Sequence, residues 1–218
     1  SRIVDDETAV VADMNRDRIK ETFANIGQEG RPGLIVFLTA GHPDREATLE
    51  LVPELVAAGA DAIELGVPFS DPLGEGFTIQ ESSFQALKQR VTLEDCLEMA
   101  RQLRDRVPDT PLILMGYYNP VLAYGLDRFA GKAQEAGVDG LIVVDLPQFE
   151  VEPLASYCIP RSLHIIPLLA PTSTEESIRT ACAAATGFIF RCFGDHGFRG
   201  DHETGNGCSS LQPGATDF

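Results

Sequence analysis

The chain alternates short apolar runs with longer segments in which apolar residues recur at helical spacing. The short runs predict strands near 34–39, 61–66, 111–116, 140–145, 163–168 and 187–191. The longer segments predict helices near 16–26, 46–58, 79–88, 93–106, 127–136, 150–156 and 175–185. Alternating strands and helices are typical of parallel strands joined by crossover helices. The pattern therefore predicts an α/β fold with about six recognisable strands.

Two of the predicted helices end with the same pattern. Each exit carries a glycine, Gly59 or Gly137, one residue after an alanine, and a strand follows almost at once. Such repeated helix-to-strand units fit a barrel and a doubly wound sheet equally well. No G-x-G-x-x-G motif follows a strand, which makes a dinucleotide-binding fold less favoured.

One predicted strand carries a carboxylate inside an apolar run. Glu64 is the only charged residue between Ala62 and Val67, and an acidic, glycine-bearing loop follows it. An isolated ionised carboxylate is costly in a buried strand, so such a group is either paired or functional. An acid at the carboxyl end of a barrel strand is typical of a catalytic site. The residue by itself leaves the structural and the catalytic interpretations open.

Composition narrows the class of protein. The chain has 218 residues, of which 44% are hydrophobic and 23% charged, enough to bury the core of one globular domain. The formal net charge of −16 argues against nucleic acid and anionic membrane surfaces as partners. Five scattered cysteines without a C-x-x-C pair predict neither a zinc site nor a disulfide framework. We expect a cytoplasmic protein, because no apolar stretch is long enough to span a membrane.

The segment 64–80, ELGVPFSDPLGEGFTIQ, resembles the signature of tryptophan synthase alpha chains, which typically read E-L-G-hydrophobic-P-[FY]-S-D-P-hydrophobic-A-D-G-P-x-I-Q. The resemblance covers about residues 16–190. Four further segments follow in the family's order, namely LIVFLTAGHPD at 34–44, LMGYYNPVLAYG at 114–125, AGVDGLIVVDLP at 136–147 and IIPLLAPTST at 165–174. The resemblance implies a TIM (β/α)8 barrel, which here reads as incomplete.

The resemblance also implies an activity. Members of the family are carbon–carbon lyases that cleave indole-3-glycerol phosphate by a retro-aldol step, without metal or cofactor, in tryptophan biosynthesis. The expected partner is a tryptophan synthase beta chain, in an α2β2 heterotetramer. Two alternatives stay open: a catalytically impaired subunit that only binds or activates a beta chain, and a stand-alone lyase that releases indole.

By the same resemblance, two carboxylates carry the chemistry. Glu64 matches the general acid–base residue, and Glu75 matches the aspartate that accepts a hydrogen bond from the indole N–H. Glu75 is one methylene longer than that aspartate, and Gly74 stands where the family usually has alanine. The remaining matches are substrate-binding residues: Phe37, Met115, Tyr117 and Phe190 as walls of the indole pocket, and Thr39 and Asp145 as organisers of the site. Ordinary barrel filling is the alternative for the four wall residues.

Three regions are expected along the chain. Residues 1–15 read as an acidic arm, 16–190 as the barrel domain, and 191–218 as an irregular tail that does not match the family. The tail repeats Gly-Asp-His at 194–196 and 200–202, which favours a frameshifted translation of the region that forms the phosphate-binding loop. A metal site is the less favoured alternative for the tail, with His196, His202, Cys192 and Cys208 as ligands.

Overall fold

A computed structural model describes residues 16–192 and 209–211, the last three as backbone only. Its centre is a curved sheet of five parallel strands in the order β1-β2-β3-β4-β5. The register places Phe37 opposite Glu64, and Glu64 opposite Ile113. The strands are β1 (Ile35–Thr39), β2 (Ala62–Gly66), β3 (Leu112–Gly116), β4 (Gly140–Val143) and β5 (His164–Ile165).

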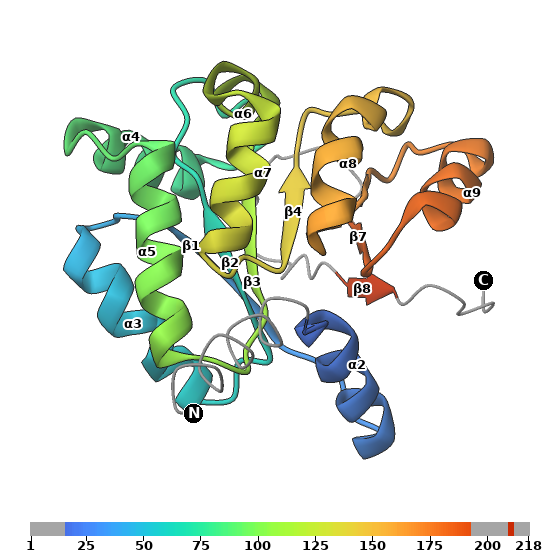
Figure 1. The fold of residues 1–218 in the computed structure, drawn as a ribbon, viewed down its shortest axis with the longest axis horizontal. Coiled ribbons are helices and arrows are strands. Elements are labelled where there is room, and N and C mark those ends of the chain that lie inside the picture. Colours follow the sequence, from blue (N-terminus) through green and yellow to red (C-terminus); the bar gives the residue numbers. More distant parts are fainter. Residues whose placement is uncertain (1–15, 193–208, 212–218) are drawn as a thin grey trace, which may run out of the picture.

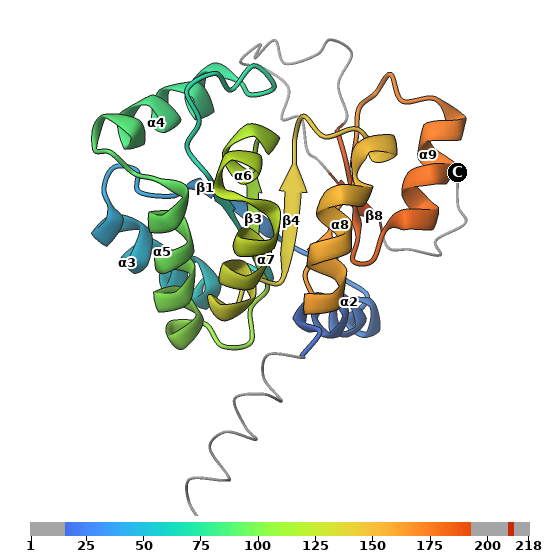
Figure 2. The ribbon, with the colours of Figure 1, turned by 45° about the horizontal axis from the view of Figure 1, so that its top comes forward.

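A second small sheet continues this arrangement. It contains β6 (Leu168–Leu169), β7 (Ile189–Arg191) and β8 (Ser209–Leu211), with β6 and β7 parallel and β7 and β8 antiparallel. Figures 1 and 2 show it beside α8 and α9, at the end of the molecule away from α3.

Four helices cover the outer face of the main sheet, and Figure 1 shows them side by side. They are α3 (Arg45–Ala57), α5 (Leu93–Arg106), α7 (Leu126–Glu135) and α8 (Glu152–Cys158). Thr92 and Asp95 start α5 with a reciprocal capping box, which satisfies backbone N–H groups at its first turn. The shorter α6 (Tyr118–Tyr124) and the helix α4 (Phe77–Lys88) lie near the carboxyl ends of the strands.

The remaining helices close the ends of the fold. Figure 2 shows α2 (Arg18–Glu29) at the amino ends of the strands, opposite α4. Beyond β4 the chain forms the short 3-10 helices Gln148–Glu150 and Ile159–Arg161, and α9 (Glu175–Ala184) packs by the second sheet. None of the helices in residues 16–192 combines the length and the apolar character needed to cross a membrane.

Alternate strand residues face two different apolar layers. Ile63 and Leu65 of β2 pack outward against the covering helices, in the larger core cluster. Ala62 of the same strand faces inward, where it meets Ile113 and the α2 residue Ile19. Because side chains alternate along a strand, Glu64 also belongs to the inner face. The sheet therefore curves around an interior that contains the side chain of Glu64.

The predicted α/β barrel and its strand positions are confirmed, with three differences. The single strand expected at 163–168 is two strands, β5 and β6, because Pro167 between them has no N–H for a ladder bond. The helix α6 was not predicted, since its seven residues are too few to show helical periodicity. The tail, expected to be irregular, contains strand β8 within its described residues.

Candidate active site

Glu64 lies at the inner face of β2, two residues before the carboxyl end of the strand. Its side chain is 3% exposed. Gly66 ends the strand. A Cβ at this position would lie 2.5 Å from Cζ of Phe37, so the absence of a side chain leaves room for the Phe37 ring beside Glu64. The strand register fixes the same neighbourhood, with Phe37 on β1 opposite Glu64.

The carboxyl group of Glu64 is buried without compensation. Its Oε1 has no hydrogen-bond partner among the described residues, and within residues 16–192 the acid forms no ion pair. Burial, and secondarily the negative charge of Glu75, raise the pKa of Glu64 to about 7. Desolvation disfavours the charged form of a carboxylic acid, and a nearby like charge adds to that effect. The neutral form of Glu64 is therefore favoured up to about neutral pH.

Glu75 approaches Glu64 from the turn that connects β2 to α4. Its side chain is 9% exposed, and burial raises its pKa above the ordinary value. The turn is closed by the Glu75 N–H, which donates to the carbonyl of Pro72 at 3.0 Å. On the other side, Nε2 of Gln80 donates to the carbonyl of Glu75 at 2.9 Å. These bonds fix the backbone that carries the second acid.

A small cleft opens at the carboxyl ends of β1, β2 and β3. Four of the residues predicted to bind substrate line it together with Glu75, namely Phe37, Thr39, Met115 and Tyr117. Phe190 packs against the same inner apolar cluster as Phe37 and Met115, but it is not among the residues that line the cleft. The structure thus brings Glu75 and four of the expected substrate-binding residues together at one end of the barrel, whereas Glu64 is not among the residues that line the cleft.

The sequence did not indicate how the cleft is tied to α4. Thr39 shares a hydrogen bond of 2.6 Å with the hydroxyl of Ser82, and Ser83 accepts from the Phe69 N–H at 3.3 Å. Tyr117 stacks on Phe69 with ring centroids 4.8 Å apart. Two adjacent serines on the predicted helix over 79–88 were the available signal, because a buried serine such as Ser83 must find a hydrogen-bond partner.

Asp145 lies outside this cleft. Its side chain is exposed, and its Oδ1 accepts the backbone N–H of Tyr118 at 2.7 Å. The bond joins the segment after β4 to the start of α6, beside Tyr117. Asp145 is therefore placed to hold the backbone around the cleft, and it does not line the cleft itself.

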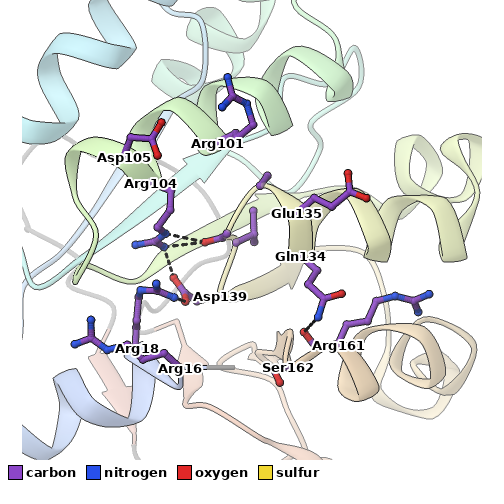
Figure 3. Close-up of a pocket in the computed structure, with 13 residues that line it drawn as sticks. Arg16, Arg18, Arg101, Arg104, Asp105, Gln134, Glu135, Asp139, Arg161 and Ser162 are labelled. Carbon is purple, nitrogen blue, oxygen red and sulfur yellow. Dashed lines mark hydrogen bonds and ion pairs between the residues drawn. The ribbon is translucent and has the colours of Figure 1, made fainter. Parts of the chain in front are cut away.

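A second cavity of about 510 Å3 opens at the opposite end of the fold, where the strands begin. At its centre Asp139 accepts from Nη2 of Arg104 at 2.6 Å and from Nη1 of Arg18 at 3.2 Å. Figure 3 shows both guanidinium groups turned toward Asp139, whereas the side chains of Arg101 and Arg161 point away from it.

The arginines of this cavity have partners within the fold. Arg104 also donates to the carbonyls of Val107, Thr110 and Gly137, and Arg18 to that of Pro108. Arg101 pairs with Glu98, Arg161 with Asp127, and Arg16 with Glu21 and Asp109. The hydrogen bonds and ion pairs around this cavity therefore connect α2, α5 and the start of β4, which is a structural role.

A metal site has no support in the described part of the chain. Within residues 16–192, no three His, Cys, Asp or Glu side chains come together as a group that could hold an ion. Of the four ligands considered for the tail, only Cys192 lies in the described residues. His196, His202 and Cys208, and with them the frameshift hypothesis, lie outside those residues.

Known proteins have sequences similar to this one. The sequence profile of the family described as "Tryptophan synthase alpha chain" matches residues 23–206, which runs beyond the expected limit of residue 190. The tryptophan synthase alpha chain of Roseiflexus sp. (strain RS-1) is 48% identical over 173 residues, covering 79% of this chain and 66% of the relative. That of Geobacter sulfurreducens is also 48% identical over 173 residues, covering 79% and 65%. This chain spans just under two thirds of the length of these curated relatives.

Solved structures share the fold. Tryptophan synthase subunit alpha from Legionella pneumophila str. Paris superposes with a TM-score of 0.78 at 40% identity, covering 81% of this chain and 67% of that one. A chain from the tryptophan synthase α2β2 complex of Pyrococcus furiosus gives 0.69 at 38% identity, covering 73% and 64%. Together with the profile match and the barrel around Glu64, these likenesses show that the chain belongs to the tryptophan synthase alpha chain family.

Proposed function

We propose that this protein cleaves indole-3-glycerol phosphate to indole and glyceraldehyde 3-phosphate, as a carbon–carbon lyase of tryptophan biosynthesis. The observation that carries the proposal is Glu64, a buried acid whose Oε1 has no partner among the described residues and whose pKa is raised to about 7, near Glu75, which lines the cleft. Family membership supports the same reaction and substrate.

The reaction asks for proton transfers that Glu64 is suited to carry out. A proton is added to C3 of the indole ring, the bond from C3 to the glycerol carbon breaks, and the hydroxyl on that carbon loses its proton to become an aldehyde. Protons are therefore neither gained nor lost overall. A group whose pKa lies near the working pH is both an adequate acid and an adequate base. Glu64 is such a group, because a pKa of about 7 makes both its neutral and its ionised form available near neutral pH.

Glu75 serves the leaving indole in this proposal. Its carboxylate accepts a hydrogen bond from the indole N–H, which holds the ring in place while C3 is protonated. Phe37, Met115 and Tyr117 offer apolar walls for that ring, and Phe190 lies in the same inner cluster. Thr39 and Asp145 hold the backbone at the mouth of the barrel through their bonds to Ser82 and Tyr118.

The partner in this proposal is a tryptophan synthase beta chain, in an α2β2 assembly. Two large apolar side chains flank Glu75 in exposed positions, with Leu73 87% and Phe77 81% exposed. Leu122 of α6, near the same end of the barrel, is also exposed. Exposed apolar side chains close together are typical of surfaces that bind another protein. The proposal places the assembly in the cytoplasm.

The rate of indole formation from indole-3-glycerol phosphate tests the proposed reaction. We expect Glu64→Gln to lower kcat about 10²- to 10⁴-fold, because it keeps the shape and removes the proton-exchanging group. Glu50→Gln on the outer helix α3 is the matched control, and its kcat should equal that of the unaltered protein. Wild-type turnover by Glu64→Gln would mean that Glu64 is structural.

Measuring beta-chain activation separately decides between the alternatives. Indole formation by the isolated protein at its full rate would favour a stand-alone lyase. Activation of a beta chain without any indole formation would favour an impaired subunit that acts only by binding. The proposed function requires indole formation that increases when the beta chain is added.

A further inference from the structure

The turn that carries Glu75 is held by a residue outside it. The backbone N–H of Gly74 donates to the hydroxyl of Tyr117 at 2.9 Å, which joins the turn to the end of β3. The ring of Tyr117 is itself fixed, because it is buried and stacks on Phe69 with an interplanar angle of 23°. The hydroxyl therefore offers the turn a rigid point of attachment.

Gly74 lies so close to Val144 and Tyr117 that a Cβ at this position would force a neighbouring group to move. A Cβ at Gly74 would lie 2.9 Å from Cγ1 of Val144 and 3.1 Å from the hydroxyl of Tyr117. A separation below 3.0 Å forces one of the groups to move, and Val144 is itself held by a backbone bond to Gly116 at 2.9 Å. The missing side chain at position 74 thus sets how near the turn lies to β3 and β4.

We propose that the hydroxyl of Tyr117 is a positioning group that, through its bond to Gly74, fixes the carboxylate of Glu75 next to that of Glu64. The proposal rests on the proposed function for the importance of that placement. Tyr117 thereby acts on the reaction in two ways, since its ring lines the cleft and its hydroxyl holds the turn. Removing the hydroxyl alone separates the contribution of the ring from that of the hydroxyl.

The placement of Glu75 affects Glu64 in a way that can be measured without turnover. Burial, and secondarily the charge of Glu75, raise the pKa of Glu64, and the turn carries that second charge. If the turn loses its attachment, we expect Glu75 to move away from Glu64. A more distant negative charge favours the ionised form of Glu64, so its pKa should fall toward the ordinary value for a glutamic acid.

The test is Tyr117→Phe, which keeps the ring and its stacking on Phe69. We expect the pKa of Glu64, followed by NMR of the labelled carboxyl carbon, to fall by about 0.5 to 1 unit. We expect kcat for indole formation to fall ~10-fold with little change in KM, because a misplaced group costs mainly transition-state stabilisation. Tyr157→Phe, on the partly exposed face of α8, is the control and should change neither quantity.

A second pair of variants tests the contact from the other side. Gly74→Ala should lower the pKa of Glu64 and kcat in the same direction as Tyr117→Phe, since its Cβ pushes the turn away from Val144. Adding Val144→Ala removes the methyl group that the Cβ would strike, and should restore most of both quantities. Val144→Ala alone gives the baseline for that comparison.

The possible results distinguish the positioning role of Tyr117 from the proposed lyase function. An unchanged pKa of Glu64 and unchanged kcat in Tyr117→Phe would overturn the positioning role. A pKa that falls in Gly74→Ala and is not restored by Val144→Ala would overturn the part assigned to the contact with Val144. If the unaltered protein formed no indole, the proposed function would fail, while the carboxyl titration would still decide the role of Tyr117.

Discussion

The two ends of the barrel bury acids in opposite ways. At the carboxyl ends of the strands, Glu64 is 3% exposed, and its Oε1 has no partner among the described residues. At the amino ends, Asp139 is 6% exposed and accepts bonds from Arg104, Arg18 and the backbone N–H of Leu112, the last at 2.8 Å. Burial is almost equal, but the partners differ completely.

The groups around each acid determine how far its pKa departs from the ordinary value. Burial raises the pKa of Asp139 above its ordinary value, but the charge of Arg104 and the bond from Leu112 oppose that rise. The second acid beside Glu64 adds to the rise instead, so the pKa of Glu64 reaches about 7. A charge held by two guanidinium groups joins elements of the fold, whereas a buried acid with a pKa near neutral has the property that the proposed acid–base role requires.

The largest effect on stability is expected where the paired acid is removed. Asp139→Asn leaves the buried guanidinium groups of Arg18 and Arg104 without their carboxylate, which should lower the free energy of unfolding by about 3–5 kcal/mol. Asp61→Asn is the matched control. That aspartate also accepts a backbone bond and pairs with Arg31, whose side chain is largely exposed, so about 1 kcal/mol or less is expected.

Urea titration of the two variants measures this difference. We expect Asp139→Asn to lose far more stability than Asp61→Asn, while the pKa of Glu64 in the folded variant stays unchanged. Equal losses for both variants would show that the network under the barrel contributes no more than a surface pair.

The next effect concerns the dependence of stability on pH. The folded-state pKa of Glu64, about 7, lies above its unfolded value near 4.5, so folded Glu64 binds its proton more tightly. Its contribution therefore falls as pH rises from about 4.5 to 7 and stays low above that. Glu64→Gln removes this loss of stability. Relative to the unaltered protein, the free energy of unfolding of the variant should therefore rise by about 3 kcal/mol between pH 4.5 and pH 8.

Urea midpoints of Glu64→Gln and the unaltered protein, taken across this pH range, give the measurement. The gain must appear between pH 4.5 and 7 and level off above it. A gain of the same size at every pH would mean that the amide merely packs better, and that Glu64 carries no raised pKa.

The smallest effect is expected from shortening the second acid. Glu75→Asp keeps the charge and withdraws the carboxylate by one methylene, so we expect kcat for indole formation to fall only a few-fold, about 1 kcal/mol in the barrier. The position of Gly74 against Tyr117 suggests that the turn is adapted to the longer acid. A large gain in kcat would instead identify Glu75 as a defect in this site.

The order of elements was predictable because hydrophobic periodicity is a local property. The strands β1 to β4 lie where apolar runs predicted them, and Glu64 was recognisable as a charge inside one run. The segment over 163–168 was harder, because the break at Pro167 divides one apolar run between two sheets. Strand β8 had no local signal, since its pairing with β7 joins residues distant in the sequence.

The repeated helix exits show where local reasoning stops. Gly59 and Gly137 were predicted to end helices, and both have positive φ, +109° and +71°. The aspartate that follows each exit, Asp61 or Asp139, accepts the N–H at the start of the neighbouring strand, from Leu34 or Leu112. The sequence contained this repetition, but the meaning of the aspartates depends on a strand that lies beside them only after folding.

Strands β1 to β4, the covering helices, the family and the two acids of the candidate site could be predicted from the sequence alone. Those features depend on residue type and spacing along the chain, which folding does not alter. Folding was needed to show that Oε1 of Glu64 has no partner among the described residues, that Arg18, Arg104 and the Leu112 N–H all donate to Asp139, and that Gly74 donates to Tyr117. The pKa of an acid and the position of a loop depend on groups that the folded chain brings close from far along the sequence.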